Sequence, residues 1–234
     1  MNIYYSKTVP VWRNFENFLY KIIKNNNFTK IAEIGGGAHP LFDELEDNLD
    51  FNVIDISSVE MNKAPSKYNK IVADICSSTL TIDSKFDLVF TKMLAEHIKN
   101  PVQMHLNIFN LLKKGGIAVH FFPTLFAIPF VFNKYISNYT SRYLVKKMTT
   151  RNLNYKPKFP AYYKWCFGPL KSLSRRYENL GFEVLQYIGL FGHEQYYHFL
   201  PILKRIDNNV SNILIKHPCP YLTSFSILVL KKNN

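Results

Sequence analysis

Residues 30–39 read KIAEIGGGAH. The segment 30–34, in which three of five residues are apolar, is typical of a short strand, and three glycines follow it directly. Glycine lacks a Cβ atom and tolerates positive φ, so a turn of this kind can bend tightly and approach a ligand closely. The stretch predicts a strand followed by a ligand-binding turn, while a turn with no further role stays the alternative.

Strands and helices alternate on both sides of this stretch. Short apolar runs separated by helical periodicity are typical of an α/β domain with a mostly parallel sheet and helices on both faces. The segments predicted as strands are 30–34, 51–56, 70–73, 86–90, 117–122, 182–188 and 225–230. The segments predicted as helices are 11–24, 40–49, 57–64, 101–112 and 169–180.

The alternation is interrupted twice, late in the chain. Insertions at about 122–168 and 192–222 are rich in aromatic and basic residues, and the second contains a further helical stretch. We expect them to pack together as a cap over the carboxyl ends of the strands. At 234 residues, the chain suits one domain spanning 1–234.

Cysteine usage and the apolar runs indicate a cytoplasmic protein. Cys76, Cys166 and Cys219 are far apart, and they predict neither a disulfide framework nor a zinc site. The start of the chain has no signal-peptide pattern. The longest apolar run, 121–132, contains two prolines and is shorter than the roughly 20 residues that a bilayer crossing needs.

Positive charge is concentrated in the middle of the chain. The net charge is +12, and residues 97–177 hold 14 Lys and Arg residues but no Asp or Glu. Surface lysines often serve only solubility, which would explain the total but not this asymmetry. The segment therefore favours an anionic partner, such as a phosphate, an acidic glycan, nucleic acid or a lipid surface.

Two carboxylates follow the next predicted strands. Asp55 ends the second strand, 18 residues beyond Gly37, and Asp74 follows the third. In an open α/β sheet, ligands bind at the carboxyl ends of the strands, and a carboxylate there can accept hydrogen bonds from both ribose hydroxyls. Asp74 would suit an adenine amino group. For both residues, a helix-capping or turn role is the alternative.

The order and spacing of these motifs resemble the class I S-adenosylmethionine-dependent methyltransferases, especially the small-molecule branch typified by ubiquinone- and menaquinone-pathway enzymes. The resemblance covers roughly residues 28–122 and, through the last strands, the overall plan, so the seven predicted strands would form a Rossmann-like sheet. It rests on EIGGG at 33–37, the two aspartates, FDLVF at 86–90, AEHI at 95–98 and LKKGG at 112–116. Two departures are His39, in place of the third motif glycine, and Lys114, in place of the proline before the double glycine.

The resemblance implies S-adenosyl-L-methionine as cofactor, S-adenosyl-L-homocysteine as product, and a set of cofactor-binding residues. Glu33, Gly35 and Gly37 would surround the methionine part. Asp55, with Ile56 beside it, would hold the ribose, and Asp74 with Ile75 would hold the adenine. Lys92 and Met93 would lie beside the methionine amine and the sulfonium.

The acceptor side offers two histidines and four tyrosines. A hydroxyl acceptor needs a base within hydrogen-bond reach. His193 is the first choice and His97 the second, with packing or capping as the alternative for His97. The insertions resemble those of bacterial surface-polysaccharide methyltransferases, and their aromatic side chains suit sugar rings. The predicted substrate-binding residues are Tyr162, Tyr163, Tyr196 and Tyr197, and no metal is expected.

The leading hypothesis is an O-methyltransferase acting on a small, anionic sugar or nucleotide-linked precursor of a surface glycan. An RNA methyltransferase is a second reading, although residues 91–94, TKML, lack the Asn/Asp-Pro-Pro-aromatic tetrad. N- or phospho-group methylation of a small metabolite, dinucleotide binding and a non-catalytic subunit are further alternatives. Contact with a membrane surface stays open, as does the oligomeric state.

Overall fold

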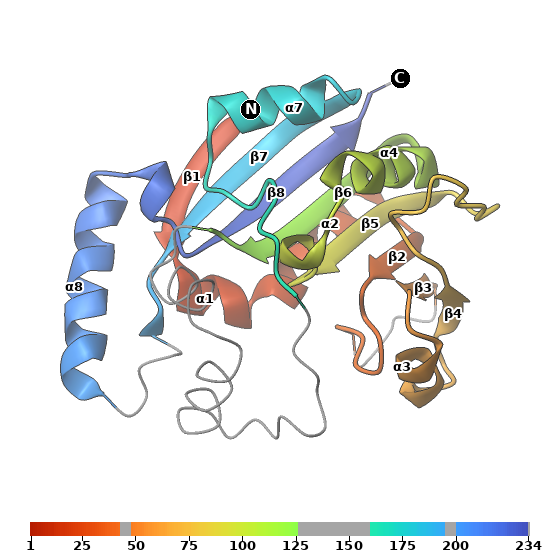
Figure 1. Cartoon of the computed structure of the whole chain (residues 1–234), viewed down its shortest axis with the longest axis horizontal. Coiled ribbons are helices and arrows are strands. Elements are labelled where there is room, and N and C mark those ends of the chain that lie inside the picture. Colours follow the sequence, from red (N-terminus) through yellow and green to blue (C-terminus); the bar gives the residue numbers. More distant parts are fainter. Residues whose placement is uncertain (43–47, 126–159, 195–199, 234) are drawn as a thin grey trace.

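One sheet organises the chain, whose computed structural model describes residues 1–42, 48–125, 160–194 and 200–233. Eight strands formed by the described residues lie in the order β1-β7-β8-β6-β5-β2-β3-β4 (Figure 1). The strands are β1 Asn2–Lys7, β2 Lys30–Ile34, β3 Asp50–Asp55, β4 Asn69–Val72, β5 Phe86–Lys92, β6 Leu112–Pro123, β7 Phe182–Phe191 and β8 Phe225–Lys232.

The order in which the strands follow one another across the sheet reverses beside β2. β8 runs antiparallel to both of its neighbours, β6 and β7, whereas every other pairing in the sheet is parallel. From β2 the chain continues to β3 and β4 on one side, and β5 then joins on the other side. Such a switch of order opens a crevice at the carboxyl ends of the strands, where ligands bind in open α/β sheets.

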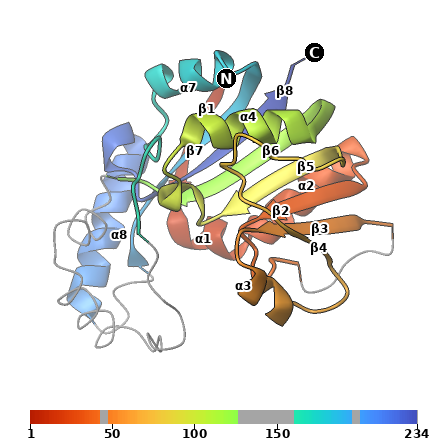
Figure 2. The ribbon, with the colours of Figure 1, turned by 45° about the vertical axis from the view of Figure 1, so that its right-hand side comes forward.

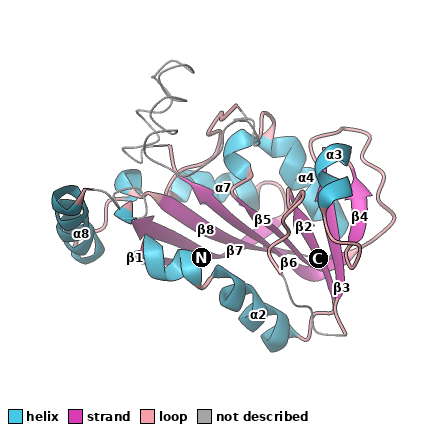
Figure 3. Ribbon diagram, turned by 90° about the horizontal axis from the view of Figure 1, so that it is seen from below, coloured by secondary structure: helices cyan, strands magenta, loops and turns pink. Residues whose placement is uncertain are grey.

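Helices cover both faces of the sheet. Apolar residues of α4 and α7 pack with one side of the sheet, and those of α2 pack with the other. Figures 2 and 3 show α4 and α2 on opposite faces. The helices are α1 Thr8–Arg13, α2 Phe15–Asn26, α3 Ser58–Lys63, α4 Pro101–Leu111, α7 Lys171–Glu178 and α8 Pro201–Lys216, with short 3-10 turns at Ala95–His97 and Pro220–Leu222.

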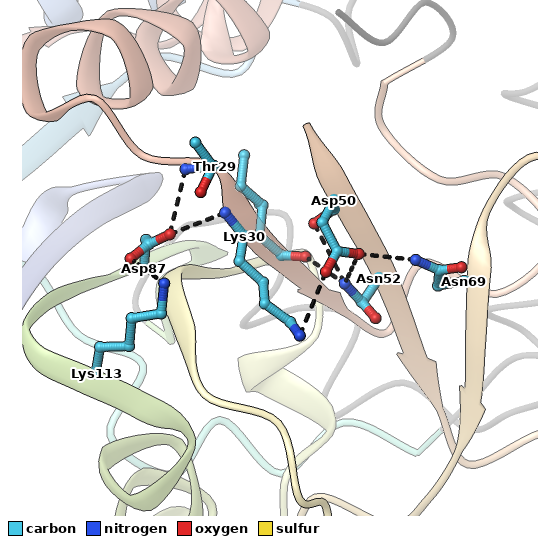
Figure 4. Close-up of polar contacts among 8 residues, drawn as sticks. Thr29, Lys30, Asp50, Asn52, Asn69, Asp87 and Lys113 are labelled. Carbon is cyan, nitrogen blue, oxygen red and sulfur yellow. Dashed lines mark hydrogen bonds and ion pairs between the residues drawn. The ribbon is translucent and has the colours of Figure 1, made fainter. Parts of the chain in front are cut away.

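Asp87 ties three segments together at the amino-terminal edge of the sheet (Figure 4). Its Oδ2 accepts the backbone N–H groups of Thr29 at 3.2 Å and Lys30 at 2.9 Å, and its Oδ1 lies 2.8 Å from Nζ of Lys113. Burial alone would raise the pKa of Asp87, but the bonds from Lys113, Lys30 and Thr29 outweigh it and hold the pKa below its usual value. The carboxylate therefore fixes the starts of β2, β5 and β6 relative to one another.

Asp50 makes the equivalent contacts for the neighbouring strands (Figure 4). Its Oδ1 accepts hydrogen bonds from the side-chain amides of Asn52 and Asn69, both at 2.8 Å. Its Oδ2 lies 3.3 Å from Nζ of Lys30. These side chains come from β2, β3 and β4, so polar contacts hold this edge of the sheet.

The prediction of seven strands was wrong by one. β1 pairs in parallel with β7, from Asn2 opposite Gln186 to Lys7 opposite Phe191. Its six residues, NIYYSK, mix polar and aromatic side chains, and the strand forms through a partner some 180 positions away. Local periodicity carries no signal for such a pairing, whereas the mostly parallel α/β sheet itself is confirmed.

Two predicted helices differ from the structure. The segment predicted at 11–24 forms two helices, α1 and α2, separated at Asn14, which has φ −108° and ψ 13°. Of the segment predicted at 40–49, residues 43–47 lie outside the described residues, and the remainder is not helical. The helix predicted at 101–112 is confirmed as α4, and β6 begins directly after it at Leu112, so residues 113–116 are part of the strand.

The two described ends of the first insertion contact each other, and its start also contacts the residues that directly follow the second insertion. The Thr124 N–H donates to the Ser224 carbonyl at 3.0 Å, and the Thr124 hydroxyl donates to the Thr223 carbonyl. The Leu125 N–H donates to the Cys166 carbonyl at 2.8 Å. Residues 126–159 and 195–199 lie outside the described residues, so the cap stays a prediction. None of the helices in the described ranges combines the length and apolar character that a membrane crossing requires.

Candidate active site

The turn after β2 requires glycine for two distinct reasons. Gly35 has φ +83°, and its N–H donates to the Ile54 carbonyl at 2.8 Å, so the chain turns while still attached to β3. A Cβ at Gly35 would lie 2.9 Å from Leu94 Cδ1. Positive φ therefore favours glycine at this position, and a larger residue would also require the Leu94 side chain to shift.

Glu33 lies beneath this turn and is only 4% exposed. Its Oε2 accepts the Leu41 N–H at 2.8 Å, and a Cβ at Gly36 would lie 3.0 Å from the Glu33 carboxyl carbon. Burial raises the pKa of Glu33 to about 7, although the Leu41 bond and the nearby Lys92 charge act in the opposite direction. The turn thus encloses a carboxyl group that titrates close to neutral pH.

Lys92 brings a positive charge to the same place. It is the last residue of β5 and half-buried, and its Nζ lies 5.6 Å from the centre of the Trp12 ring. Burial lowers the pKa of Lys92, and the carboxylates of Glu33 and Glu16 partly counteract this. A carboxylate and an ammonium group therefore lie near each other at the switch of strand order.

Asp55 ends β3 opposite the glycine turn. Its Oδ1 accepts the Ser57 N–H at 2.8 Å, while its Oδ2 lies 3.3 Å from the point that a Cβ on Gly37 would occupy. The N-cap of α3 is Ser57, whose hydroxyl accepts the Glu60 N–H at 3.2 Å, so capping does not account for Asp55. The adjacent Ile56 is 67% exposed and offers an apolar surface at this strand tip.

The segment after β4 differs in part from the expectation. Asp74 is exposed, with Oδ1 accepting the Cys76 N–H at 2.8 Å. The Ile75 side chain, by contrast, packs in the core beside α4. Asn107 of α4 donates to the carbonyls of Ile75 at 2.7 Å and Ser77 at 2.8 Å, and so holds the segment in place.

Sequence reasoning missed Asn107, although a signal was present. It occupies an apolar position of α4, three residues after the buried Met104 and one before the buried Ile108. A polar side chain within an apolar helical stripe indicates a buried hydrogen-bond partner.

The residues after β5 leave the strand through a strained turn. Met93 has φ +57°, which is uncommon for a residue other than glycine, and its N–H donates to the Phe121 carbonyl at 2.8 Å. The next residue, Leu94, covers Gly35. Backbone strain of this kind concentrates at functional sites.

Glu96 is a second buried carboxyl group, only 4% exposed. Its Oε2 has no hydrogen-bond partner among the described residues, and its Oε1 lies 3.7 Å from Nε2 of His97. Burial raises the pKa of Glu96 to about 8. The folded chain therefore favours the protonated form of Glu96 through neutral pH.

The Glu96–His97 turn is attached to the segment that follows the first insertion. His97 Nδ1 lies 2.8 Å from the Pro160 carbonyl, and the N–H groups of Tyr162 and Tyr163 donate to the Glu96 carbonyl at 2.7 and 3.1 Å. Tyr162 is partly exposed, with Lys99 Nζ 5.5 Å from its ring centre. Tyr163 is buried in the core, with φ +51°.

The other two predicted tyrosines, Tyr196 and Tyr197, lie outside the described residues. Of the four tyrosines assigned to the acceptor, Tyr162 is thus the one that the described structure leaves partly open.

His193 is located elsewhere along the same edge of the sheet. It follows β7, and its N–H donates to Asp207 Oδ2 at 2.8 Å, with Nδ1 3.4 Å from Asp207 Oδ1. β8 and β6 separate β7 from β5, a span of about 14 Å at normal strand spacing. The structure therefore does not bring His193 and His97 together.

Metal-ligating side chains do not cluster in the described ranges, where no group of three or more His, Cys, Asp or Glu residues is arranged to hold a metal ion.

The raised pKa of Glu96 predicts a pH-dependent gain in stability for Glu96→Gln. Between about pH 4.5 and 8, the unfolded chain loses the Glu96 proton and the folded chain keeps it, so rising pH favours unfolding of the wild type. The free energy of unfolding of the variant, relative to wild type, should rise by about 1.4 kcal/mol per pH unit over this range and level off above it. Denaturant titrations at several pH values measure this difference.

Glu183→Gln, which removes an exposed carboxylate of β7, is the matched control and should show no such rise. A pH-independent difference for Glu96→Gln would contradict the buried, protonated carboxyl.

Residues 32–120 match a family model described as a methyltransferase domain. No curated protein matches the chain. Among solved structures, the chain is similar to an S-adenosylmethionine-dependent methyltransferase from Clostridium acetobutylicum, with 11% identity, a TM-score of 0.59 and coverage of 95% of this chain and 92% of the other.

Two further structures show the same fold. One is a SAM-dependent methyltransferase from Archaeoglobus fulgidus, with 13% identity, a TM-score of 0.54 and coverage of 96% and 100%. The other is the N-methyltransferase NodS from Bradyrhizobium japonicum in complex with S-adenosyl-l-homocysteine, with 12% identity, a TM-score of 0.54 and coverage of 96% and 89%. The chain thus resembles a methyltransferase domain over residues 32–120, and it shares the fold of these three structures, with a sheet whose order reverses beside the glycine turn.

Proposed function

We propose that this chain is a cytoplasmic enzyme that methylates a hydroxyl group of a small, anionic acceptor, a sugar or nucleotide-linked precursor of a surface glycan. The observation that carries the proposal is the set of charges at the switch point: Glu33 and Lys92 beside the glycine turn, and Asp55 at the next strand tip. S-adenosylmethionine supplies the methyl group from a positively charged sulfonium.

The two charges beside the turn match the amino-acid end of this cofactor. The Glu33 carboxylate suits the cofactor's amine, and the Lys92 ammonium suits its carboxylate. Lys92 would not lie beside the amine and the sulfonium, as the family resemblance implied, because like charges repel at short range. Met93, the residue after Lys92, leaves an uncharged thioether at this strand end.

The ribose and adenine would lie along β3 and β4. Asp55 Oδ2 faces the glycine turn, where it can accept hydrogen bonds from both ribose hydroxyls. Ile56 provides the apolar surface for one face of the purine, and the exposed Asp74 can accept from the adenine amino group. Ile75 would take part through its backbone, since its side chain is in the core.

Positive charge near the Glu96–His97 turn supports an anionic acceptor. Lys99 and Lys164 are exposed there, and Lys164 Nζ donates to the Lys99 carbonyl at 2.9 Å. Lys99 also lies over the ring of Tyr162. An aromatic face beside an ammonium group suits a sugar that carries phosphate or carboxylate.

His97 and His193 remain the candidate bases, and geometry favours His97. It lies in the short turn that follows β5, five residues after Lys92, whereas His193 follows a strand three positions further along the sheet. Pro160 and the neighbouring Glu96 carboxyl orient the His97 ring. Glu96 is therefore a positioning residue in this proposal, acting through His97.

Methylation of nitrogen is the second candidate. NodS, which has the same fold, is named an N-methyltransferase. A neutral amine needs alignment but no base, so loss of both histidines would leave its methylation largely intact.

Asp55→Ala tests the cofactor assignment. S-adenosylhomocysteine at about 100 times its Kd should stabilise the wild type by about 2.7 kcal/mol, a rise in Tm of roughly 5–10 °C for a chain of this size. The variant should lose that rise, because it removes the acceptor for the ribose hydroxyls. Differential scanning fluorimetry measures the shift, with Asp83→Ala in an exposed loop as the matched control. Equal stabilisation by NAD would contradict the assignment.

Methyl transfer from labelled donor to a panel of nucleotide sugars, glycan extract, small amines and RNA tests the acceptor class. With an anionic sugar, kcat/KM should fall as salt rises, since screening shortens the Debye length from about 10 Å at 0.1 M to roughly 3 Å at 1 M. His97→Ala should lower kcat by about 10²–10⁴-fold while binding of S-adenosylhomocysteine is retained.

His193→Ala serves as the comparison and should have the smaller effect on kcat. Near-wild-type turnover in both variants would rule out catalysis by a histidine base and favour an amine acceptor. Transfer to RNA alone would contradict the small-molecule proposal.

A further inference from the structure

α8 is attached to the rest of the molecule by its polar side. Lys7 Nζ donates to Asn208 Oδ1 at 2.7 Å, and the His193 N–H donates to Asp207 Oδ2 at 2.8 Å. A Cβ at Gly192 would lie 2.9 Å from Ser211 Oγ, so the helix approaches the end of β7 closely at this point. Ser211 is the buried residue of α8. Figures 1 and 2 show the helix beside β1, at the end of the sheet.

The opposite side of α8 is apolar and faces outward. Ile202, Ile206, Val210 and Ile213 recur at helical spacing, and Ile202 is 77%, Ile206 53% and Ile213 60% exposed. A surface helix of a globular domain normally turns this side to the core. We call Ile202, Leu203, Ile206, Val210 and Ile213 the apolar stripe; the exposed Tyr221 and Leu222 follow soon after it.

The charges around the apolar stripe are positive. α8 contains Lys204, Arg205 and Lys216, all exposed, and a single acid, Asp207. The Asp207 carboxylate is turned inward, onto His193. Lys204 is paired with Glu194 at 2.6 Å, and Arg205 and Lys216 flank the stripe at helical spacing.

This arrangement matches the chemistry of an anionic lipid surface. An amphipathic helix with an exposed apolar side and flanking Lys and Arg residues lies in the plane of the bilayer interface. Sixteen residues span about 24 Å, shorter than a crossing of roughly 20 residues requires. A second copy of this chain would bring equal sets of cations together, which disfavours that occupant.

We propose that α8 docks the protein on an anionic bilayer surface through the apolar stripe. The helix is anchored at Lys7 and His193, at the carboxyl ends of β1 and β7. These strands are parallel to β2 and β5, so the glycine turn lies along the same edge of the sheet. Docking would hold this edge beside the membrane, whatever the acceptor.

Flotation of the full-length protein with vesicles, in the absence of cofactor, tests the proposal. Vesicles of pure phosphatidylcholine are compared with vesicles that also contain phosphatidylglycerol. Ile206→Glu and Asn212→Glu each add one carboxylate to an exposed position of α8, and Asn212 lies away from the stripe. The wild type should bind the anionic vesicles, and Asn212→Glu should weaken binding by up to about fivefold through charge alone.

Ile206→Glu should weaken binding at least about tenfold more than Asn212→Glu, because it also removes an apolar contact with the acyl region. Equal binding of both variants would mean that vesicle binding depends on the overall charge of the protein, and it would contradict docking through the apolar stripe. Absence of wild-type binding, or a dimer that dissociates only in Ile206→Glu, would also overturn the proposal. The thermal shift with S-adenosylhomocysteine measures cofactor binding independently of vesicle binding. Failure of the membrane proposal can therefore be distinguished from failure of the methyltransferase assignment.

Discussion

The buried carboxyl group of Glu33 determines the shape of the turn that follows β2. Its bond to the Leu41 N–H draws the chain back over the side chain, and its carboxyl carbon would lie only 3.0 Å from a Cβ at Gly36. Burying a carboxylate is costly in free energy, which the pKa of about 7 reflects. A positively charged amine beside Glu33 would lower that cost, so the turn is arranged to favour a cationic ligand group.

The amino-terminal edge of the sheet stabilises the fold, and the carboxyl-terminal edge carries the groups that we propose bind the ligand. At the amino-terminal edge, Asp87 and Asp50 join five strands through backbone, lysine and asparagine groups. At the carboxyl-terminal edge, Asp55 and Glu33 each accept a backbone N–H with one carboxylate oxygen. Among the described residues, the other oxygen of each has no hydrogen-bond donor, so it can accept from a ligand. Because the first set holds the strands in register, the second set can be presented at fixed spacing to a ligand.

The sequence predicted the local features of the site well. β2 has the predicted bounds, and Asp55 ends β3 as expected, since the short apolar runs and the glycines carry local signals. The inward side chain of Ile75 and the role of Asn107 depend on how α4 packs against the next strand, which periodicity does not specify. β1 depends on β7, which is distant in the chain, for its pairing. The exposure of the apolar stripe depends on which side of α8 is attached to the sheet, and local periodicity does not specify this either.

A crystal structure of the protein with S-adenosylhomocysteine bound tests the central claim most directly. The account predicts both ribose hydroxyls on Asp55, the amine beside Glu33, the carboxylate beside Lys92 and the purine over Ile56. A ligand bound away from the turn after β2, or bound there with its amino-acid end remote from Glu33 and Lys92, would contradict the account.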